Sequence, residues 1–483
     1  MSRDMRFAII GAGMAGILSA VKLAEAGFTD FTIYEKADRV GGTWRENTYP
    51  GVACDVPSQL YCYSFALNSE WTHPYASGEE IESYFERVAR DYDVERSIRF
   101  GDEIVACEFV DGRWHLETAS GHRDVVDIVI AATGVLHHPS YPDIEGLESF
   151  TGHAFHSARW DHDVPLAGKR VGVIGTGSTA VQITAAIVDE VEHLSLFQRT
   201  AQWVMPQENP PYTDEMKKVF RDDPALLEKI HGELSQMFAD GFANAVVDAD
   251  SPGMKMIEDV CRDNLEQNVI DLELRERLRP DYRAACKRLV VSGDFYQAIQ
   301  RPNAELVTAG IECVEPGGIR TRDGVLRELD VLVLATGFHV DSFMRPMSVV
   351  GRDATRLADV WAERPNAYLS ISIPDFPNFF MLNGPNGPVG NFSLIEVAEL
   401  QFEYIMGLVE RIRSGECREI SATSDAMEHH EADRVEAAKK TVWTTGCRSW
   451  YLDDRGVPAT WPWPFDRFRA EMAAPKAEAY EVR

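Results

Sequence analysis

Residues 7–16 have the sequence Phe-Ala-Ile-Ile-Gly-Ala-Gly-Met-Ala-Gly, and this stretch decides the fold. The four apolar residues predict a buried strand, and the glycines predict a tight turn into a helix. Glycines at such a turn let the backbone approach a pyrophosphate, while the helix N-terminus supplies N–H donors and a positive dipole. We therefore predict a dinucleotide-binding unit with Gly11, Gly13 and Gly16 at the phosphates.

A second stretch of the same kind occupies residues 171–180, with the sequence Val-Gly-Val-Ile-Gly-Thr-Gly-Ser-Thr-Ala. Gly175, Gly177 and Ala180 take the three positions of this second phosphate cradle. Two cradles predict two bound dinucleotides. Apolar runs at 127–134 and 331–338 both end in Ala-Thr-Gly, and we expect each to be a buried strand that rejoins one of the two sheets.

The residue after the second strand of each unit predicts which nucleotide binds. Glu35 lies as far along the chain from Gly11 as Arg199 lies from Gly175. A carboxylate there accepts hydrogen bonds from ribose hydroxyls, whereas a guanidinium, followed here by Thr200, binds a 2′-phosphate. The first site should hold FAD or NAD and the second NADP. Arg199 as an ordinary surface arginine is the alternative, and the shared register favours the phosphate role.

The net charge of the chain excludes some classes of binding partner. The 483 residues carry a net charge of −29, from 48 basic and 77 acidic side chains. Nucleic acids and anionic membranes need a basic surface, so neither is an expected partner. No apolar run approaches the roughly 20 residues of a membrane span, and the first strand starts close to the N-terminus. We therefore expect a cytoplasmic protein.

The eight cysteines are scattered along the chain, with no Cys-x-x-Cys pair and no metal-ligand spacing to histidine. We expect reduced thiols and no metal site. The missing closely spaced pair also disfavours a flavin-dependent disulfide reductase.

Two further patterns lie outside the cradles. The first consists of Phe150, Gly152, His156, Trp160 and Asp161. The second consists of Gly41-Gly42-Thr43-Trp44, Tyr49-Pro50-Gly51 and Asp55. Together they resemble the fingerprints of type I Baeyer–Villiger monooxygenases, which are class B flavoprotein monooxygenases. Related N- and S-oxygenating flavin monooxygenases share the cradles but usually lack the Trp-Asp ending.

The resemblance implies an α/β fold with two Rossmann-like dinucleotide-binding domains and a helical insertion. The FAD domain would comprise residues 1–142 and 339–483, and the NADP domain residues 143–206 and 287–338. Residues 207–286 would form the insertion, which is rich in Glu, Asp, Lys, Leu and Met and lacks strand-like alternation.

The implied reaction inserts one oxygen atom of O2 beside a ketone carbonyl, giving an ester or lactone. NADPH would reduce FAD, and O2 would then give a C4a-peroxyflavin that attacks the ketone. Two alternatives stay open: an N- or S-oxygenating monooxygenase, and a catalytically idle dinucleotide-binding sensor. An idle protein would be expected to have a broken cradle or no active-site arginine.

Arg288, in the segment Cys-Lys-Arg-Leu, resembles the family's active-site arginine. Arginine suits a site that must keep an oxygen anion, because it cannot lose its proton. Asp55 resembles the carboxylate that orients this arginine, and a cap or turn residue is its alternative role. Trp44 belongs to the same cofactor-binding pattern as Asp55.

Two predictions concern movement. His156 lies between the nucleotide domains, and we interpret it as a hinge contact, with direct acid–base catalysis as the alternative. Trp450 resembles the tryptophan of a mobile substrate lid. After Tyr451 the chain departs from many relatives: it continues Leu-Asp-Asp-Arg-Gly-Val-Pro, where they have a Gly-Ala-Asn type of sequence. The oligomeric state does not follow from the sequence.

Overall fold

The structure is a computed structural model, and it describes residues 5–483. Its first sheet has five parallel strands in the order β19-β7-β1-β2-β3. Helix α1 (Met14–Glu25) follows β1 directly, as the first glycine cradle predicts. The strands, in sheet order, are Phe379–Met381, Ile128–Ala131, Phe7–Ile10, Phe31–Glu35 and Ile98–Phe100.

The second sheet repeats this arrangement with five parallel strands in the order β13-β10-β9-β17-β8. Helix α4 (Ser178–Ile187) follows β9 as α1 follows β1. The predicted α/β fold with two Rossmann-like units is confirmed. The strands, in sheet order, are Ala304–Val307, His193–Phe197, Arg170–Ile174, Val331–Leu334 and His153–His156.

Each cradle packs against the strand that returns to its sheet. A methyl group on Gly11 would lie 2.7 Å from the carbonyl oxygen of Ala132, and one on Gly175 would lie 2.3 Å from that of Ala335. Both glycines have positive φ angles, 102° and 125°. Only glycine fits so close to backbone in this conformation, and the two Ala-Thr-Gly runs do rejoin the sheets as predicted.

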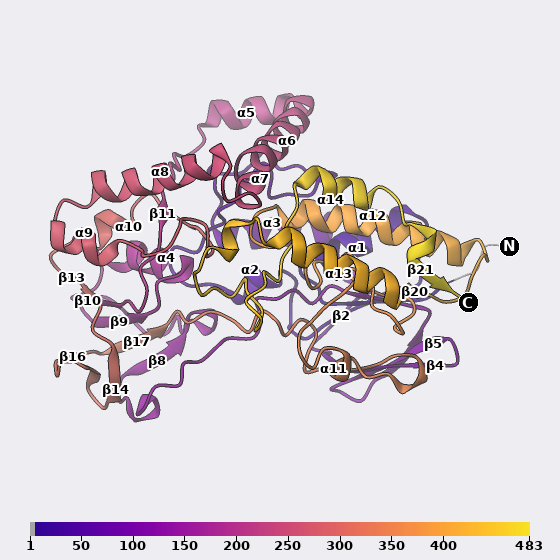
Figure 1. Ribbon diagram of the computed structural model, residues 1–483, viewed down its shortest axis with the longest axis horizontal. Helices are drawn as coiled ribbons and strands as arrows, with labels where there is room; N and C mark the ends of the chain where they lie inside the picture. The colour runs from indigo at the N-terminus through magenta and orange to yellow at the C-terminus, as the bar shows by residue number, and fades with distance from the viewer. Residues whose placement is uncertain (1–4) are drawn as a thin grey trace.

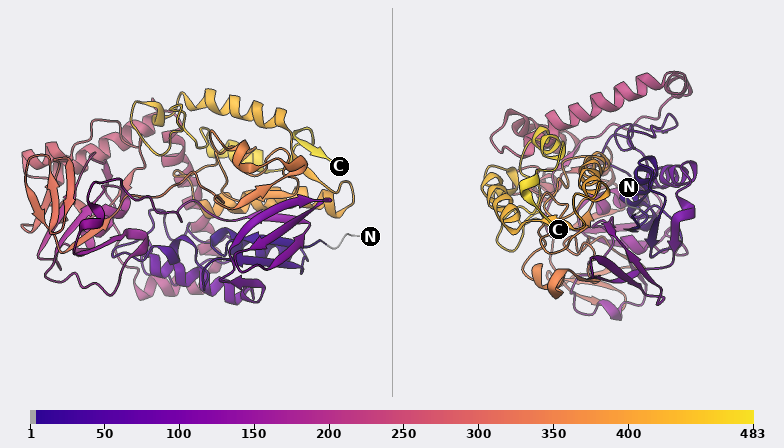
Figure 2. Two further views of the ribbon diagram at one scale, coloured as in Figure 1. Left: turned by 90° about the horizontal axis from the view of Figure 1, so that it is seen from below. Right: turned by 90° about the vertical axis from the view of Figure 1, so that its right-hand side faces the viewer.

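Smaller sheets extend both halves. Beside the first sheet lies a four-stranded sheet, β18-β4-β5-β6, in which β18 runs parallel to β4 and the other neighbours are antiparallel. Figure 2 (left) shows its strands β4 to β6 in purple below the C-terminal helices. Beside the second sheet lies the three-stranded sheet β14-β15-β16. Their strands, in these orders, are Ser348–Val350, Ile104–Val110, Arg113–Thr118, Arg123–Val126, Ile311–Glu315, Gly318–Thr321 and Leu326–Glu328.

Residues 207–286 contain helices and no strand, as predicted. Each main helix begins with a capping side chain that accepts a backbone N–H, for example Thr213 before α5 and Ser251 before α8. On α5, Phe220 is buried against Tyr212, whereas Met216 and Val219 are exposed. Figure 1 shows α5 and α6 projecting from the body. The helices are α5 (Asp214–Asp222), α6 (Pro224–Phe238), α7 (Asn244–Val246), α8 (Pro252–Asn268) and α9 (Leu272–Leu278).

The C-terminal part returns to the first sheet. Helix α12 (Leu394–Arg413) begins after Ser393 and packs on α1. Both ends of the described chain lie at the same end of the molecule, opposite the second sheet (Figure 1). The other elements of this part are α13 (Ser424–Ala438), α14 (Phe465–Met472), β20 (Ile420–Ala422) and β21 (Tyr480–Val482). Short elements elsewhere are α2 (Thr43–Glu46), α3 (Gly78–Asp91), α10 (Phe295–Ala298), α11 (Leu357–Val360), β11 (Val204–Met205) and β12 (Val290–Val291).

The cysteines depart from expectation in one respect. Cys286 and Cys447 form a disulfide, so the expectation that all eight thiols are reduced is wrong for this pair. The two residues are 161 positions apart, and only the folded chain brings them together.

Among residues 5–483, no helix is both long and apolar enough to cross a membrane.

Candidate active site

One cavity of about 1470 Å³ extends from the first cradle to the second. The two sheets contribute opposite ends of its wall, and the C-terminal loop contributes the rim. A cavity of this size can hold two dinucleotides and a small substrate between them. Its lining includes these predicted site residues: Gly13, Glu35, Trp44, Asp55, Gly175, Gly177, Arg199, Thr200, Arg288 and Trp450.

At the first cradle, Glu35 ends β2 and is buried. Its carboxylate accepts hydrogen bonds from the backbone N–H of Ala12 (2.8 Å) and of Ala37 (2.9 Å), and from Arg45 (3.1 Å). These bonds fix the carboxylate beside the cradle while its remaining lone pairs can accept ribose hydroxyls. Trp44 lines the same part of the cavity and donates to the Tyr61 hydroxyl (3.2 Å).

The loop of residues 383–393 contributes to the cavity wall beside this cradle. Asn383 lines the cavity, and its side-chain oxygen is buried without a hydrogen-bond partner among residues 5–483. Side-chain polar atoms of Asn386, Asn391 and Ser393 are also buried without a partner there, but these residues do not line the cavity. Buried polar atoms are normally paired, so the Asn383 oxygen is available to a polar ligand in the cavity. Together with the cradle, it fits FAD.

At the second cradle, Arg199 is exposed on the cavity wall, two residues after the end of β10. Lys287 lines the same wall, and its pKa is lowered by burial and by the charge of Arg199. Two neighbouring cations of this kind favour an anion between them. The backbone carbonyl of Thr200 accepts a hydrogen bond from Thr176 (2.8 Å), which holds the segment against the cradle. This arrangement fits the 2′-phosphate of NADP.

Arg288 and Asp55 meet in the wall between the two cradles, 233 residues apart in sequence. The guanidinium donates to the Asp55 carboxylate through Nη2 and to the carbonyl oxygen of Gly390 through Nη1. Burial opposes the charge of Arg288, but Asp55 outweighs this effect, so the pKa of Arg288 is raised. The site therefore holds a permanent positive charge at the centre of the cavity.

Comparison with known proteins identifies the family. Residues 4–352 match the family described as flavin-binding monooxygenase-like.

The chain belongs to the flavin-binding monooxygenase-like family.

Among curated members of this family, an uncharacterised monooxygenase of Mycobacterium tuberculosis is 50% identical over 479 residues, which is 99% of this chain and 96% of that protein. A Baeyer–Villiger monooxygenase of Streptomyces coelicolor is 39% identical over 486 residues, 99% of this chain and 92% of that protein. Among solved structures, the cyclohexanone monooxygenase from Rhodococcus sp. Phi1 bound to NADP+ covers 99% of both chains, with 30% identity and a TM-score of 0.88.

The predicted linker residue His156 ends β8 and is buried. Its Nδ1 accepts the N–H of Ala158 (3.1 Å), so Nε2 carries the proton and donates to the carbonyl oxygen of Gly337 (3.1 Å). Burial lowers its pKa. His156 is thus a neutral side chain that joins the linker to the end of β17, and it does not line the cavity.

The other linker residues are structural neighbours of β8. Phe150 packs on Gly152, where an added methyl group would lie 2.7 Å from the ring and 2.4 Å from the Asp330 carbonyl oxygen. Trp160 packs edge-to-face on Phe155, and Asp161 accepts the N–H of Asp163. The linker contacts the first domain through the ion pair of Arg159 with Glu46 (2.6 Å). This linker fingerprint therefore lies outside the cavity, in the connection between the domains.

Trp450 lies at the cavity rim and is 46% exposed. Its place agrees with a cover over the cavity, and its role as a moving lid stays a prediction.

Sequence reasoning missed two side chains of the site. Lys287 was signalled only by its position directly before Arg288, and Tyr451 only by its position directly after Trp450.

Proposed function

We propose that this chain catalyses Baeyer–Villiger oxidation of a ketone to an ester or lactone, with Arg288 and Asp55 as the charged pair at the reacting oxygen. It is a flavoprotein monooxygenase that uses FAD and NADPH. FAD, when bound, accepts the hydride of NADPH and activates O2. Glu35 and the first cradle would hold FAD, and Arg199, Lys287 and the second cradle would hold NADP.

The chemistry asks the protein to stabilise negative charge on oxygen. A guanidinium beside the reacting atoms does this at every physiological pH, because it does not titrate. Asp55 and the Gly390 carbonyl fix its direction, so no reorganisation is needed when charge develops on oxygen.

The observation that carries this proposal is the Arg288–Asp55 pair in the wall shared by both cradles. Baeyer–Villiger relatives that match along almost the whole chain favour ketone oxidation over N- or S-oxygenation. An idle sensor is disfavoured because both glycine cradles and the arginine are intact.

The test is oxidation of a panel of cyclic and linear ketones by the purified yellow protein with NADPH, followed by gas chromatography of the products. We expect ester or lactone from at least one ketone, and NADPH consumption that rises when this ketone is added. A panel of amines and sulfides is run beside it. Oxygenation of those compounds with no ester from any ketone would contradict the proposal.

A cytoplasmic location stays a prediction. Disulfides are generally scarce in the cytoplasm, so the Cys286–Cys447 bond disagrees with this prediction. Cell fractionation combined with thiol alkylation and mass spectrometry would show both the compartment and the redox state of this pair.

A further inference from the structure

Tyr451 lies directly behind the cavity wall and is 3% exposed. Its ring packs against Trp443, with ring centroids 5.6 Å apart, in an apolar cluster that includes Cys286 and Leu289. Its hydroxyl lies beside the Arg288 side chain, and the interaction between the two contributes to the raised pKa of Arg288. Because the ring is wedged in this cluster, the hydroxyl has one direction in which to point.

The same hydroxyl fills the space beside Gly390. A methyl group on Gly390 would lie 1.9 Å from the Tyr451 hydroxyl oxygen, so no side chain fits at this position. The Gly390 carbonyl is itself an acceptor for Arg288. Tyr451, Gly390 and Arg288 therefore form one contact, to which Asp55 adds the carboxylate.

The Arg288 guanidinium donates to two acceptors on segments that are distant in sequence, the Asp55 carboxylate and the Gly390 carbonyl. The Tyr451 hydroxyl lies against Gly390, beside these two contacts. A guanidinium is a planar fork of fixed N–H directions. Acceptors for two of its nitrogens, with Tyr451 packed beside them, therefore fix its orientation, while Arg288 still lines the cavity.

The segment that carries Tyr451 is anchored on both sides. Before it, the Cys286–Cys447 disulfide ties the segment to the chain two residues ahead of Arg288. After it, the N–H of Ala459 donates to the Tyr451 carbonyl (2.6 Å), and the Thr460 hydroxyl donates to the Gly387 carbonyl (3.0 Å). Both anchors connect the segment to the same elements that surround Arg288.

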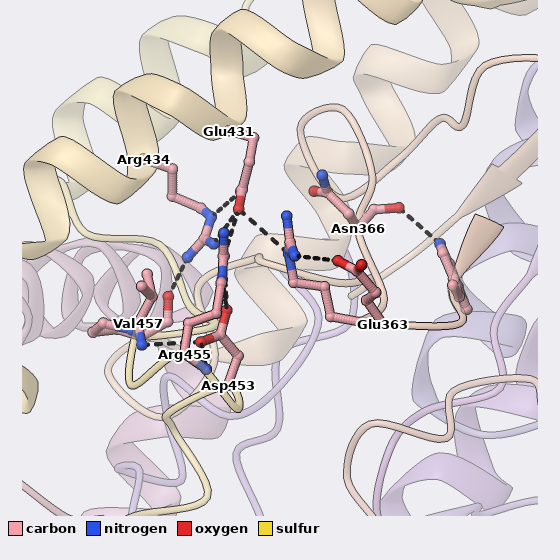
Figure 3. Close-up of polar contacts among 10 residues, drawn as sticks. Glu363, Asn366, Glu431, Arg434, Asp453, Arg455 and Val457 are labelled. Atoms are coloured by element: carbon pink, nitrogen blue, oxygen red, sulfur yellow. Dashed lines mark hydrogen bonds and ion pairs between the residues drawn. The ribbon is translucent and has the colours of Figure 1, made fainter.

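An ionic cluster that is buried at Arg434 and exposed at Arg455 holds the stretch that departs from the relatives (Figure 3). Residues 452–458 form a short hairpin in which Asp453 accepts the N–H of Val457 (3.0 Å) and pairs with Arg455 (2.7 Å). Arg455 also pairs with Glu431 of α13 (3.0 Å). The fully buried Arg434 pairs with Glu431 (2.7 Å) and donates to the Pro458 carbonyl. This part of the loop is therefore pinned to α13.

We propose that Tyr451 is a positioning residue that holds the Arg288 guanidinium toward the reacting oxygen. The proposal rests on the proposed function, in which the charge of Arg288 stabilises that oxygen. It also gives the departing stretch 452–458 a role: its ionic cluster and the disulfide keep Tyr451 in place. The loop then supplies a fixed part of the active site in addition to the rim residue Trp450.

The test is Tyr451→Phe in the FAD-loaded protein, which removes the hydroxyl and keeps the ring. The matched control is Tyr404→Phe. Tyr404 is also buried, and its hydroxyl is hydrogen-bonded to the Tyr480 hydroxyl (3.0 Å), away from the cavity. The first readout needs no ketone: the rate at which phenylglyoxal modifies Arg288, followed by peptide mass spectrometry. We expect about tenfold faster modification in Tyr451→Phe, from the loss of one polar contact beside a charged group, and no change in the control.

The second readout is coupling, measured as ester formed per NADPH consumed. We expect Tyr451→Phe to lower coupling and to release more hydrogen peroxide, with the rate of flavin reduction and the melting temperature unchanged. In an Arg288→Lys background, the effect of Tyr451→Phe on residual coupling should shrink, because the two residues act through one contact. An additive effect would overturn the proposal.

The two proposals fail in different ways. If the wild-type protein makes no ester from any ketone, the proposed function fails, and the phenylglyoxal rates still test the contact with Tyr451. If ester forms normally and Arg288 reacts at the same rate in wild type and Tyr451→Phe, Tyr451 does not position the arginine. Faster modification in both tyrosine variants would also overturn the proposal, since the effect would then be general loosening.

Discussion

The two cradles have the same backbone and opposite chemistry at one position. In both, a strand, a glycine turn and a helix are followed by a second strand whose end faces the cavity. At that end Glu35 is buried and bonded to two backbone N–H groups and to Arg45, whereas Arg199 is exposed beside Lys287. The difference supports the proposal that the backbone of each cradle binds pyrophosphate and that one side chain selects the nucleotide.

The opposite charges of Glu35 and Arg199 explain why the first is buried and the second is exposed. A carboxylate near a helix N-terminus finds backbone N–H donors and can be enclosed with them. A guanidinium only donates hydrogen bonds and meets N–H donors instead of acceptors at the equivalent place, so it stays in the cavity, where an anion can bind it. The two halves then meet at Asp55 and Arg288, one from each side.

The largest effect should come from breaking this meeting point. Arg288→Ala should retain FAD and accept hydride from NADPH, yet lose ester formation by about 10²–10³-fold or more, as when a preorganised charge is removed elsewhere. Product analysis and stopped-flow absorbance of the flavin would measure both steps. Arg283→Ala is the control, since Arg283 pairs with Glu258 and does not line the cavity. Normal ester yield from Arg288→Ala would mean that another group carries the charge.

Next in size is the carboxylate of the first cradle. Glu35→Ala should weaken FAD binding by about 10²-fold, because it removes ribose acceptors and leaves Arg45 with fewer partners. Titration of the apoprotein with FAD, followed by flavin fluorescence, gives the affinity. Glu25→Ala on the exposed end of α1 removes a carboxylate that pairs only with Lys22, and it should bind FAD normally. If Glu35→Ala bound FAD with wild-type affinity, Glu35 would not be the residue that binds the ribose at the first cradle.

A substitution at the second cradle should change the preference for NADPH over NADH. Arg199→Ala should raise the KM for NADPH by about 10–100-fold and leave the KM for NADH nearly unchanged, because only NADPH carries the 2′-phosphate. Initial rates with each coenzyme measure this ratio. Arg301→Ala, which breaks an exposed pair with Asp189 in the same domain, is the control. Equal use of NADPH and NADH by the unmutated protein would sink the assignment.

The smallest effect should come from the linker between the two regions. His156→Ala removes the bond to Gly337, and we expect turnover to slow a few-fold with altered coupling and no lost pKa in the pH–rate profile. The control is His153→Ala, since His153 begins the same strand and is exposed. A variant that is reduced normally and then stalls in oxygenation would instead place His156 in the chemistry.

The cradles show how much of the fold the sequence predicted. Strand, turn and helix are local, so an apolar run followed by spaced glycines is sufficient to place β1 with α1 and β9 with α4. The equal spacing of Glu35 and Arg199 depends on the length of one helix and two strands, and so it too could be seen without coordinates. The family motifs added Asp55 and Arg288 as candidates.

What only the tertiary structure decided are the contacts between distant segments. Asp55, Gly390, Tyr451 and Arg288 come from four parts of the chain, and no local period or spacing relates them. The Cys286–Cys447 disulfide escaped prediction for the same reason, because pairing depends on distance in space. The sequence by itself predicted the two glycine cradles with Glu35 and Arg199, since each set lies within one βαβ unit. The packing of the domains decided the geometry of the reacting centre, because that centre lies where those units and the C-terminal loop meet.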